Sequence, residues 1–249
     1  MKISVITVAF NSAETISNTL CSVAAQSYPD VEHIVIDGGS TDGTLCLVGK
    51  FGSRVSEVVS EKDRGIYDAM NKGVARATGD IVCFLNSDDS YAHQDVLANV
   101  AGTMRAAALD AVFGDVIFFH PDEPEKAVRR YRSHRFQPSR IGWGWMPAHP
   151  ALFVRREVFE RVGRFREDYR IAGDFEFVAR AFGPGNMRYR YLPDVLVKMR
   201  TGGVSTAGWR SKLLLNKEVL RACRENGIPT NLFKILSKYP AKLLEFLQK

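Results

Sequence analysis

Short apolar segments rich in β-branched residues alternate with helical segments through the first half of the chain. The first segment, residues 2–10, is apolar almost throughout, which is typical of a strand buried on both faces. Further strands are predicted over residues 31–37, 55–60, 80–85 and 111–119. Strands that alternate with helices predict an α/β fold with a mostly parallel sheet. The helices predicted in this half include residues 65–77, residues 92–108 and a helix capped by Asn11, with Glu14 completing a capping box.

The second half of the chain has a looser pattern. A strand over residues 148–154 leads into a helix, residues 173–182 favour another helix, and residues 187–199 favour a strand. Two terminal helices are predicted over residues 207–226 and 228–247, separated by a Gly-Ile-Pro turn. With 249 residues, the chain is long enough for one large domain with an appendage.

Net charge and cysteine content indicate which partners, metal sites and cell compartment suit this protein. A net charge of +6 favours an anionic partner such as a nucleotide diphosphate, an anionic membrane surface or nucleic acid, although a solvated basic surface is the simpler alternative. The four cysteines form no Cys-x-x-Cys pair, so we expect neither a zinc site nor disulfides, and a reducing cytosol fits. No signal peptide and no membrane-spanning stretch is expected. We therefore expect a cytoplasmic protein.

Polar clusters follow two of the predicted strands. One begins at Asp37, and the other is Asn86-Ser87-Asp88-Asp89. In parallel sheets ligands bind beyond the carboxyl ends of the strands, so both clusters are expected to face one crevice. Adjacent carboxylates repel each other unless a cation lies between them, and Mn²⁺ or Mg²⁺ is bound by one or two carboxylates plus phosphate oxygens. The alternative is that the second cluster caps the helix that follows.

Two further acidic positions have both functional and structural interpretations. Asp37 can accept a hydrogen bond from a uracil or guanine ring or from a ribose hydroxyl, or it can simply make a tight turn with Gly38 and Gly39. Asp174 and Glu176 stand at the start of a predicted helix. They are candidates for a general base beside a bound substrate, or for acidic residues that the helix dipole stabilises.

Four short motifs follow one another along the chain. They are Thr7-Val8-Ala9-Phe10-Asn11, Ile36-Asp37-Gly38-Gly39-Ser40-Thr41-Asp42-Gly43-Thr44, Leu85-Asn86-Ser87-Asp88-Asp89 and Gly173-Asp174-Phe175-Glu176. In these motifs and their order, the chain resembles the family 2 glycosyltransferases of the GT-A fold over roughly residues 1–205. The stretch of residues 60–73 resembles the bacterial polysaccharide, or colanic-acid-type, branch of the family.

The resemblance implies a domain organisation. It implies a Rossmann-like mixed, mostly parallel central sheet flanked by helices. The nucleotide-binding half would span about residues 1–120 and the acceptor half about residues 121–205. Residues 206–249 are left as a C-terminal helical extension.

The resemblance also implies roles for individual residues. Asp174 would be the catalytic base, and Asp88 the metal ligand with Asp89 beside it. The family often has Asp where Asn86 stands, so metal affinity is lower or Asp88 does most of the binding. The implied donor-binding residues are Thr7, Ala9, Phe10, Asn11, Asp37, Asp63, Arg64, Tyr67, Asn86 and Ser87.

Several of these assignments have a structural alternative. Asp63, Arg64 and Tyr67, together with Glu61, could instead form a solvated charge cluster that caps the helix at residues 65–77. On the acceptor side, aromatic rings could stack on sugar faces, or they could plug the core. The acceptor-side candidates are Trp143, Trp145, His149 and Glu176.

The implied reaction is a single displacement with inversion at the anomeric carbon. Asp174 would take a proton from an acceptor hydroxyl, and the metal would stabilise the leaving diphosphate. A UDP-sugar is favoured over a GDP-sugar as donor. The acceptor would be a saccharide or lipid-linked saccharide of bacterial surface polysaccharide biosynthesis.

Three other functions are less favoured. A sugar-nucleotide nucleotidyltransferase usually has a glycine-rich basic loop after its first strand, where this chain has Asn11-Ser12-Ala13-Glu14. A dinucleotide oxidoreductase lacks support because no Gly-x-Gly-x-x-Gly opens the first helix. A non-catalytic nucleotide-sugar-binding protein is the third.

The last twenty or so residues alternate apolar side chains with lysines. A basic amphipathic helix of this kind can lie on an anionic membrane, which would place the protein at the inner face of the plasma membrane. The alternative is packing on the protein body or on a partner subunit, which leaves an oligomer open. No nucleic-acid partner is expected, since no recognised binding module occurs.

Overall fold

The computed structural model describes residues 1–202 and 208–237, without the side chains of residues 124 and 125. The strands are β1 (Ile3–Ala9), β2 (Val31–Asp37), β3 (Val55–Ser60), β4 (Ile81–Phe84), β5 (Asp89–Tyr91), β6 (Ala111–His120), β7 (Glu123–Tyr131), β8 (Leu152–Arg155) and β9 (Tyr189–Arg200). The α-helices are α1 (Ile16–Ala24), α2 (Thr44–Phe51), α3 (Ile66–Arg76), α4 (Val96–Ala107), α5 (Arg156–Val162), α6 (Gly173–Phe182), α7 (Trp209–Glu225) and α8 (Leu232–Leu236). Short 3₁₀ turns are η1 (Ser133–Arg135), η2 (Pro138–Trp143) and η3 (His149–Ala151).

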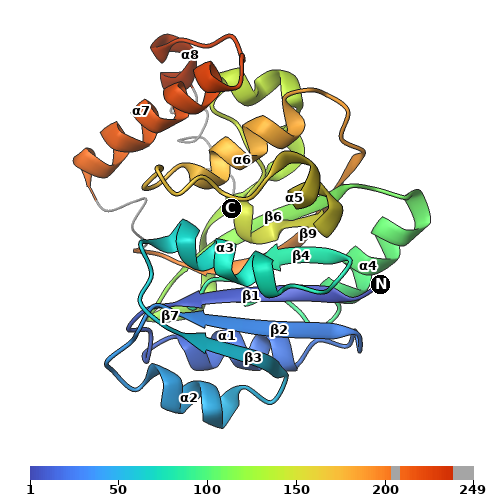
Figure 1. Cartoon of the computed structure of the whole chain (residues 1–249), viewed down its shortest axis with the longest axis vertical. Coiled ribbons are helices and arrows are strands. Elements are labelled where there is room, and N and C mark those ends of the chain that lie inside the picture. Colours follow the sequence, from blue (N-terminus) through green and yellow to red (C-terminus); the bar gives the residue numbers. More distant parts are fainter. Residues whose placement is uncertain (203–207, 238–249) are drawn as a thin grey trace.

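All of these strands belong to one sheet, in the order β3-β2-β1-β4-β8-β6-β9-β5, with β7 beside β6 (Figure 1). The first four strands in this order are parallel, and every residue of β1 is buried between helices. The register sets Ala9 opposite Asp37 and Ile6 opposite Phe84. The carboxyl ends of β1, β2 and β4 therefore meet at one edge, and the predicted α/β sheet is confirmed.

The other half of the sheet is mixed. β8 and β6 run antiparallel to their neighbours β4 and β8, whereas β9 runs parallel to β6. The short strand β5 was not predicted. It follows β4 after residues 85–88 and pairs with the end of β9, with Asp89 opposite Met199. Residues 85–88 therefore connect the parallel half of the sheet to its far end.

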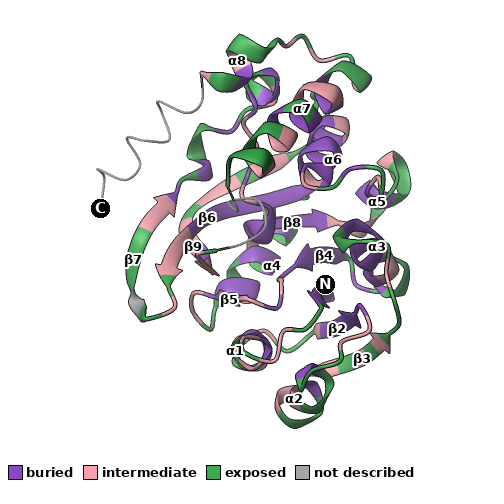
Figure 2. Cartoon of the chain, turned by 90° about the vertical axis from the view of Figure 1, so that its left-hand side faces the viewer, coloured by how far each residue is buried: buried purple, intermediate pink, exposed green. Residues whose placement is uncertain are grey.

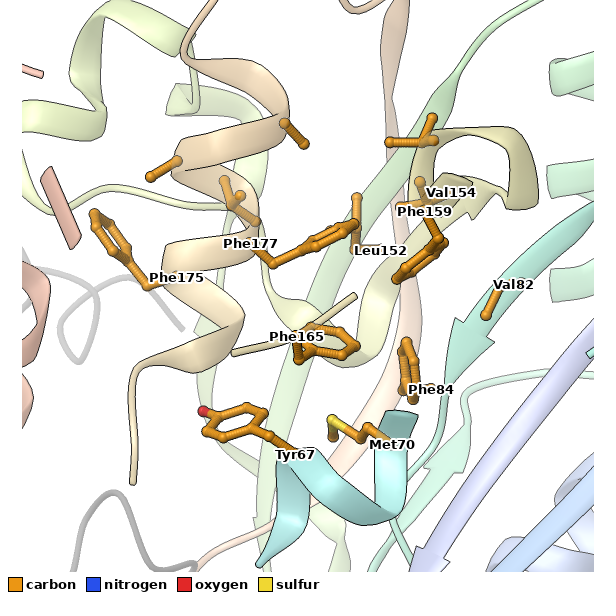
Figure 3. Close-up of a cluster of buried hydrophobic side chains, with 14 of the residues drawn as sticks. Tyr67, Met70, Val82, Phe84, Leu152, Val154, Phe159, Phe165, Phe175 and Phe177 are labelled. Atoms are coloured by element: carbon orange, nitrogen blue, oxygen red, sulfur yellow. The ribbon is translucent and has the colours of Figure 1, made fainter. Parts of the chain in front are cut away.

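Helices cover both faces of the sheet. The buried side chains of α3, α5 and α6 form one core cluster with β1, β2, β4 and β8, and those of α1, α2 and α4 pack on the opposite face. Figure 2 shows the central strands buried between these layers, whereas β7 is largely exposed. Aromatic rings fill the space between α3, β4 and α6, among them Phe84, Phe165 and Phe177 (Figure 3). This cluster forms the floor beneath the N-terminal end of α6.

The predicted capping box after β1 is wrong. The helix begins at Ile16, and Asn11 instead adopts a left-handed conformation with φ 48°. Its Oδ1 atom accepts a hydrogen bond from the Thr41 N–H at 3.0 Å, so the side chain caps a different loop. Glu14 is exposed and lies 3.8 Å from Arg200. The long-range partner of Asn11 accounts for the later start of the helix.

The helix predicted over residues 207–226 is confirmed as α7. It lies beside α6, and its residues Val219, Ala222 and Cys223 are buried in the main core (Figure 1). Of the helix predicted over residues 228–247, the structure has α8 at Leu232–Leu236, while residues 228–231 are not helical and residues 238–247 lie outside the described residues. None of the helices in the described ranges is long and apolar enough to cross a bilayer.

Candidate active site

Three loops at the carboxyl ends of β1, β2 and β4 are tied together by hydrogen bonds. The Asn11 N–H donates to Ser40 Oγ at 2.8 Å, and Asn11 Oδ1 accepts from Thr41. Ser12 Oγ lies 2.8 Å from Ser87 Oγ, which joins the first loop to the third. The loops therefore form one rim at the edge of the sheet where α/β proteins bind their ligands. Neither Ser12 nor Ser40 was predicted as a site residue, although Ser40 stands in the glycine-rich motif that begins with Ile36 and Asp37.

Asp37 organises the second loop. Its carboxylate is fully buried and accepts hydrogen bonds from the N–H groups of Gly39 and Ser40 at 3.1 and 3.0 Å. It also accepts from the hydroxyls of Ser60 at 2.7 Å and Ser40 at 2.5 Å. The tight-turn interpretation therefore describes this carboxylate, and a contact with a nucleotide base stays a prediction.

A second carboxylate and an aromatic ring border the same loop. A Cβ atom on Gly38 would lie 2.4 Å from Asp63 Oδ2 and 3.4 Å from the Phe10 ring. The other oxygen of Asp63 accepts from the Gly65 N–H at 2.9 Å. Phe10 is 62% exposed although it directly follows a buried strand. An exposed ring beside a carboxylate is an arrangement that can stack on and hydrogen-bond a nucleotide base.

Thr7 and Ala9 lie below this rim. Both are buried in β1, and Thr7 Oγ1 lies 2.9 Å from Nε2 of His33, a histidine whose pKa burial lowers to about 4. Thr7 therefore contacts a neighbouring strand. A donor contact for either residue stays a prediction.

Arg64 and its neighbours form an ion-pair network at the start of α3. The exposed Arg64 guanidinium lies 3.0 Å from Asp68 and 2.6 Å from Glu167. Lys72 pairs with Glu61 at 3.0 Å. The Arg64 N–H also donates to Asp68 at 3.0 Å, which satisfies a backbone donor just before the helix. The structure thus supports the helix-capping alternative for this cluster, while donor binding by Arg64 stays a prediction.

The residues proposed for metal binding carry unpartnered oxygens. Within the described residues, neither carboxylate oxygen of Asp89 nor Oδ1 of Asn86 has a hydrogen-bond partner, and all three atoms are buried. Burial and the charge of Asp88 raise the pKa of Asp89. Burial also raises the pKa of Asp88, against the opposing effect of Arg200. Burying an oxygen atom that has no hydrogen-bond partner costs free energy. A hard cation bound to these oxygens would offset that cost, so the cluster fits a metal site.

The described part of the chain has no cluster of three or more His, Cys, Asp or Glu side chains arranged to hold a metal. Sites that bind Mg²⁺ or Mn²⁺ together with a nucleotide commonly use one or two carboxylates and complete the coordination with phosphate and water oxygens. Asp88, partly exposed at the rim, is the carboxylate that a metal would reach first, and Asp89 lies behind it.

Asp174 lies in the first turn of α6, next to the cluster of aromatic rings between α3, β4 and α6. Its Oδ1 accepts from the Phe175 N–H at 2.7 Å and lies 3.4 Å from the Tyr67 hydroxyl. That hydroxyl donates mainly to the Ile171 carbonyl, at 2.7 Å. Burial raises the pKa of Asp174, and the electrostatic interaction with His149 and these hydrogen bonds oppose the rise. A carboxylate with a raised pKa, near solvent, is suited to accept a proton.

His149 lies next to this carboxylate. Its ring stacks on Phe84 with centroids 5.3 Å apart and meets the edge of Phe165 at 5.7 Å. Burial lowers its pKa, and Asp174 raises it. The effect of burial is the larger, so the pKa of the imidazole lies below its ordinary value. The sequence makes His149 an acceptor-side candidate, and the structure brings it to the proposed base.

The other acceptor-side candidates are Glu176, Trp143 and Trp145. Glu176 is buried and pairs with Arg180 at 2.8 Å. Trp143 is 40% exposed, carries the Lys234 ammonium 5.5 Å above its ring, and lines a cavity of about 520 Å³ between η2 and the turn after α7. Trp145 is partly buried. Acceptor contacts for these residues stay predictions.

Comparison with known proteins gives consistent matches. A family model described as glycosyl transferase family 2 matches residues 4–163. A PGL/p-HBAD biosynthesis glycosyltransferase of Mycobacterium tuberculosis is 32% identical over 223 residues, which cover 88% of this chain and 82% of the relative. Glycosyltransferase AglE of Haloferax volcanii is 32% identical over 190 residues, covering 74% of this chain and 62% of AglE.

Solved structures share the fold. Residues 1–349 of TarS from S. aureus, in complex with UDP-GlcNAc, match with a TM-score of 0.71 and 22% identity, covering 91% of this chain and 66% of TarS 1–349. The mannosyltransferase PcManGT of Pyrobaculum calidifontis, in complex with GDP-Man and Mn²⁺, matches with a TM-score of 0.68 and 24% identity, covering 95% of this chain and 68% of PcManGT. This chain therefore spans about two thirds of the length of either solved chain.

Proposed function

The chain belongs to glycosyl transferase family 2 and has the GT-A-type fold expected from its sequence, and from this premise we propose an inverting, metal-dependent glycosyltransferase. The observation that carries the mechanism is the half-buried carboxylate of Asp174, with its raised pKa, at the N-terminal end of α6. The unpartnered oxygens around Asp88 supply the second element of the proposed site.

In the proposed reaction, an acceptor hydroxyl gives its proton to Asp174 as its oxygen attacks the anomeric carbon. The bond between that carbon and the diphosphate breaks from the opposite face, so the anomeric configuration inverts. A divalent ion, Mn²⁺ or Mg²⁺, held by Asp88 would stabilise the charge that develops on the diphosphate. The ring of His149, which stacks on Phe84, lines the site beside the base.

The donor would be a nucleotide diphosphate sugar bound at the rim of the three loops. The exposed Phe10 ring and the Asp63 carboxylate are proposed to contact the base. A UDP-sugar is favoured, and the matched structures contain UDP-GlcNAc in one case and GDP-Man with Mn²⁺ in the other. The acceptor would be a saccharide or lipid-linked saccharide, within the bacterial polysaccharide branch of the family.

A donor panel tests this proposal. The full chain is incubated with UDP- and GDP-sugars and Mn²⁺, and in a second reaction with a nucleoside triphosphate, a sugar phosphate and Mn²⁺, and the released products are identified. Release of a nucleoside diphosphate supports a glycosyltransferase, whereas release of pyrophosphate from a nucleoside triphosphate and a sugar phosphate would support the nucleotidyltransferase alternative. Binding without any release would support a non-catalytic nucleotide-sugar-binding protein.

Phe10→Ala is expected to weaken donor binding about tenfold, because the variant removes an exposed ring that would stack on the base. Isothermal titration with UDP and Mn²⁺ measures the change. The matched control is Leu45→Ala, which removes an exposed apolar side chain from α2. Equal affinity of Phe10→Ala and the unmodified protein would show that Phe10 does not contact the base.

Peripheral membrane attachment is proposed for α8. In α8 the side chains of Leu232, Phe233 and Leu236 are exposed, and Lys234 lies between them. Exposed apolar residues with a cation suit an anionic bilayer surface. Such attachment would hold the protein at the inner face of the plasma membrane, near a lipid-linked acceptor.

Replacing Leu232, Phe233 and Leu236 together by Ser is expected to lower binding to phosphatidylglycerol vesicles at least about tenfold. Cosedimentation with the vesicles measures the bound fraction. Leu45→Ser, on α2, serves as the control. An unchanged bound fraction for the triple variant, or for deletion of residues 229–249, would contradict the proposal.

A further inference from the structure

One carboxylate of α7 holds the turn that leads into α6. Glu218 is buried, and its Oε1 accepts from the Arg170 N–H at 2.9 Å. Its Oε2 accepts from the N–H groups of Ile171 and Ala172, both at 2.9 Å. Three consecutive backbone donors therefore converge on one side chain that comes from more than forty residues further along the chain.

These donors have no alternative partner in the adjoining helix. Because α6 begins at Gly173, residues 170–172 precede its first turn, where N–H groups lack intrahelical acceptors. A carboxylate at this position is also favoured by the positive end of the helix dipole. Hydrogen bonds to a charged carboxylate are stronger than hydrogen bonds between neutral groups, so Glu218 holds the turn more firmly than a neutral acceptor would.

The same turn is held from its other side by α3. The Ile171 carbonyl accepts from the Tyr67 hydroxyl at 2.7 Å, while the Ile171 N–H donates to Glu218. The next two residues are Gly173 and Asp174. A Cβ atom on Gly173 would clash with the Tyr67 ring. The carboxylate of Asp174 thus stands at the end of a turn clamped between α7 and α3.

Other residues on the same face of α7 extend this contact. Arg221 pairs with Asp168 and lies 4.4 Å above the Tyr169 ring. Glu225 accepts from the Tyr169 hydroxyl at 2.6 Å and pairs with Arg166 at 2.8 Å. The spacing of residues 218, 221 and 225 puts all three on one helix face, and all three contact residues 166–172.

We propose that Glu218 is a positioning residue for the proposed base. The inference rests on the proposed role of Asp174. Glu218 acts by fixing the backbone from which Asp174 projects, so its loss would displace the carboxylate without removing it. A displacement of about 1 Å in such a group can cost about a hundredfold in rate.

The test compares three variants of the full chain. Glu218→Gln keeps the shape but turns an NH₂ group toward backbone N–H donors. Glu218→Asp keeps the charge and withdraws it by one methylene. Lys217→Gln changes the exposed neighbouring residue and serves as the control. For each, kcat is measured by nucleoside diphosphate release, donor affinity by titration, and amide hydrogen exchange over residues 166–176 by mass spectrometry.

For Glu218→Gln we expect kcat to fall about 10- to 100-fold at unchanged donor affinity, with faster exchange of the amides at residues 170–172. Glu218→Asp should restore part of kcat, and Lys217→Gln should match the unmodified protein. A kcat for Glu218→Gln within twofold of the unmodified protein, or a fall matched by an equal loss of donor affinity, would overturn the inference.

The outcomes separate this inference from the proposed function. If the unmodified chain releases no nucleoside diphosphate, the proposed function fails, and the hydrogen exchange still decides whether Glu218 holds the turn. If Glu218→Gln does not fold, Glu218→Asp tests whether Glu218 positions Asp174, by the same criteria of kcat, donor affinity and hydrogen exchange.

Discussion

Asp174→Asn is expected to lower kcat by about 10²- to 10⁴-fold and to leave donor affinity unchanged. The amide has nearly the shape of the carboxylate and can keep the hydrogen bond from the Phe175 N–H, but it cannot accept a proton from the acceptor hydroxyl. Steady-state release of nucleoside diphosphate measures kcat, and titration with UDP and Mn²⁺ measures affinity. Asp122→Asn, in the exposed turn between β6 and β7, is the matched control.

The pH dependence of kcat provides an independent check on the same residue. Asp174 must be deprotonated to act as a base, so kcat falls as the pH drops through its pKa. Burial raises that pKa above the ordinary aspartate value near 3.8, so the acidic limb should lie above that value. Full activity of Asp174→Asn would exclude this residue as the base.

Asp88→Ala is expected to abolish the metal dependence of donor binding, with at least about a tenfold loss of UDP affinity in Mn²⁺. The reason is that Asp88 is the partly exposed carboxylate at the rim, where the diphosphate would share a metal ion with it. Titrations of UDP into the protein with Mn²⁺ and with EDTA measure the difference. In the variant the two titrations should give the same affinity.

Asp89→Asn distinguishes the two neighbouring carboxylates. Asp89 is buried behind Asp88 and its pKa is raised, so a neutral amide is compatible with its surroundings. We expect this variant to keep most of the metal dependence. If Asp89→Asn lost the metal dependence and Asp88→Ala retained it, the two roles would have to be exchanged.

The central strands were predictable because burial on both faces leaves a continuous apolar run, as in β1. Their polar termini followed from the general position of ligand sites in α/β sheets. The strand β5 escaped prediction because it has three residues, and its pairing partner in β9 lies more than a hundred residues away. The start of α1 was missed for a similar reason, since the acceptor on Asn11 is used by Thr41 and not by its own helix.

Individual site residues were harder to predict than the fold. Asp174 and His149 lie 25 residues apart, and only the packing of η3 and α6 over Phe84 and Phe165 brings them together. The contribution of Glu218 had no sequence signal, because an acidic residue inside a helix is ordinary. Its function depends on three backbone donors that exist only once α7 has packed beside α6.

The central claim is a single displacement in which Asp174 activates the attacking oxygen. In the absence of acceptor, water can take the place of the hydroxyl, and the donor is hydrolysed slowly. ¹H NMR of the sugar first released from an α-linked UDP-sugar, recorded before mutarotation, reports its anomeric configuration directly. The account predicts the β-anomer from the unmodified protein and none above background from Asp174→Asn. Release of the α-anomer would contradict it.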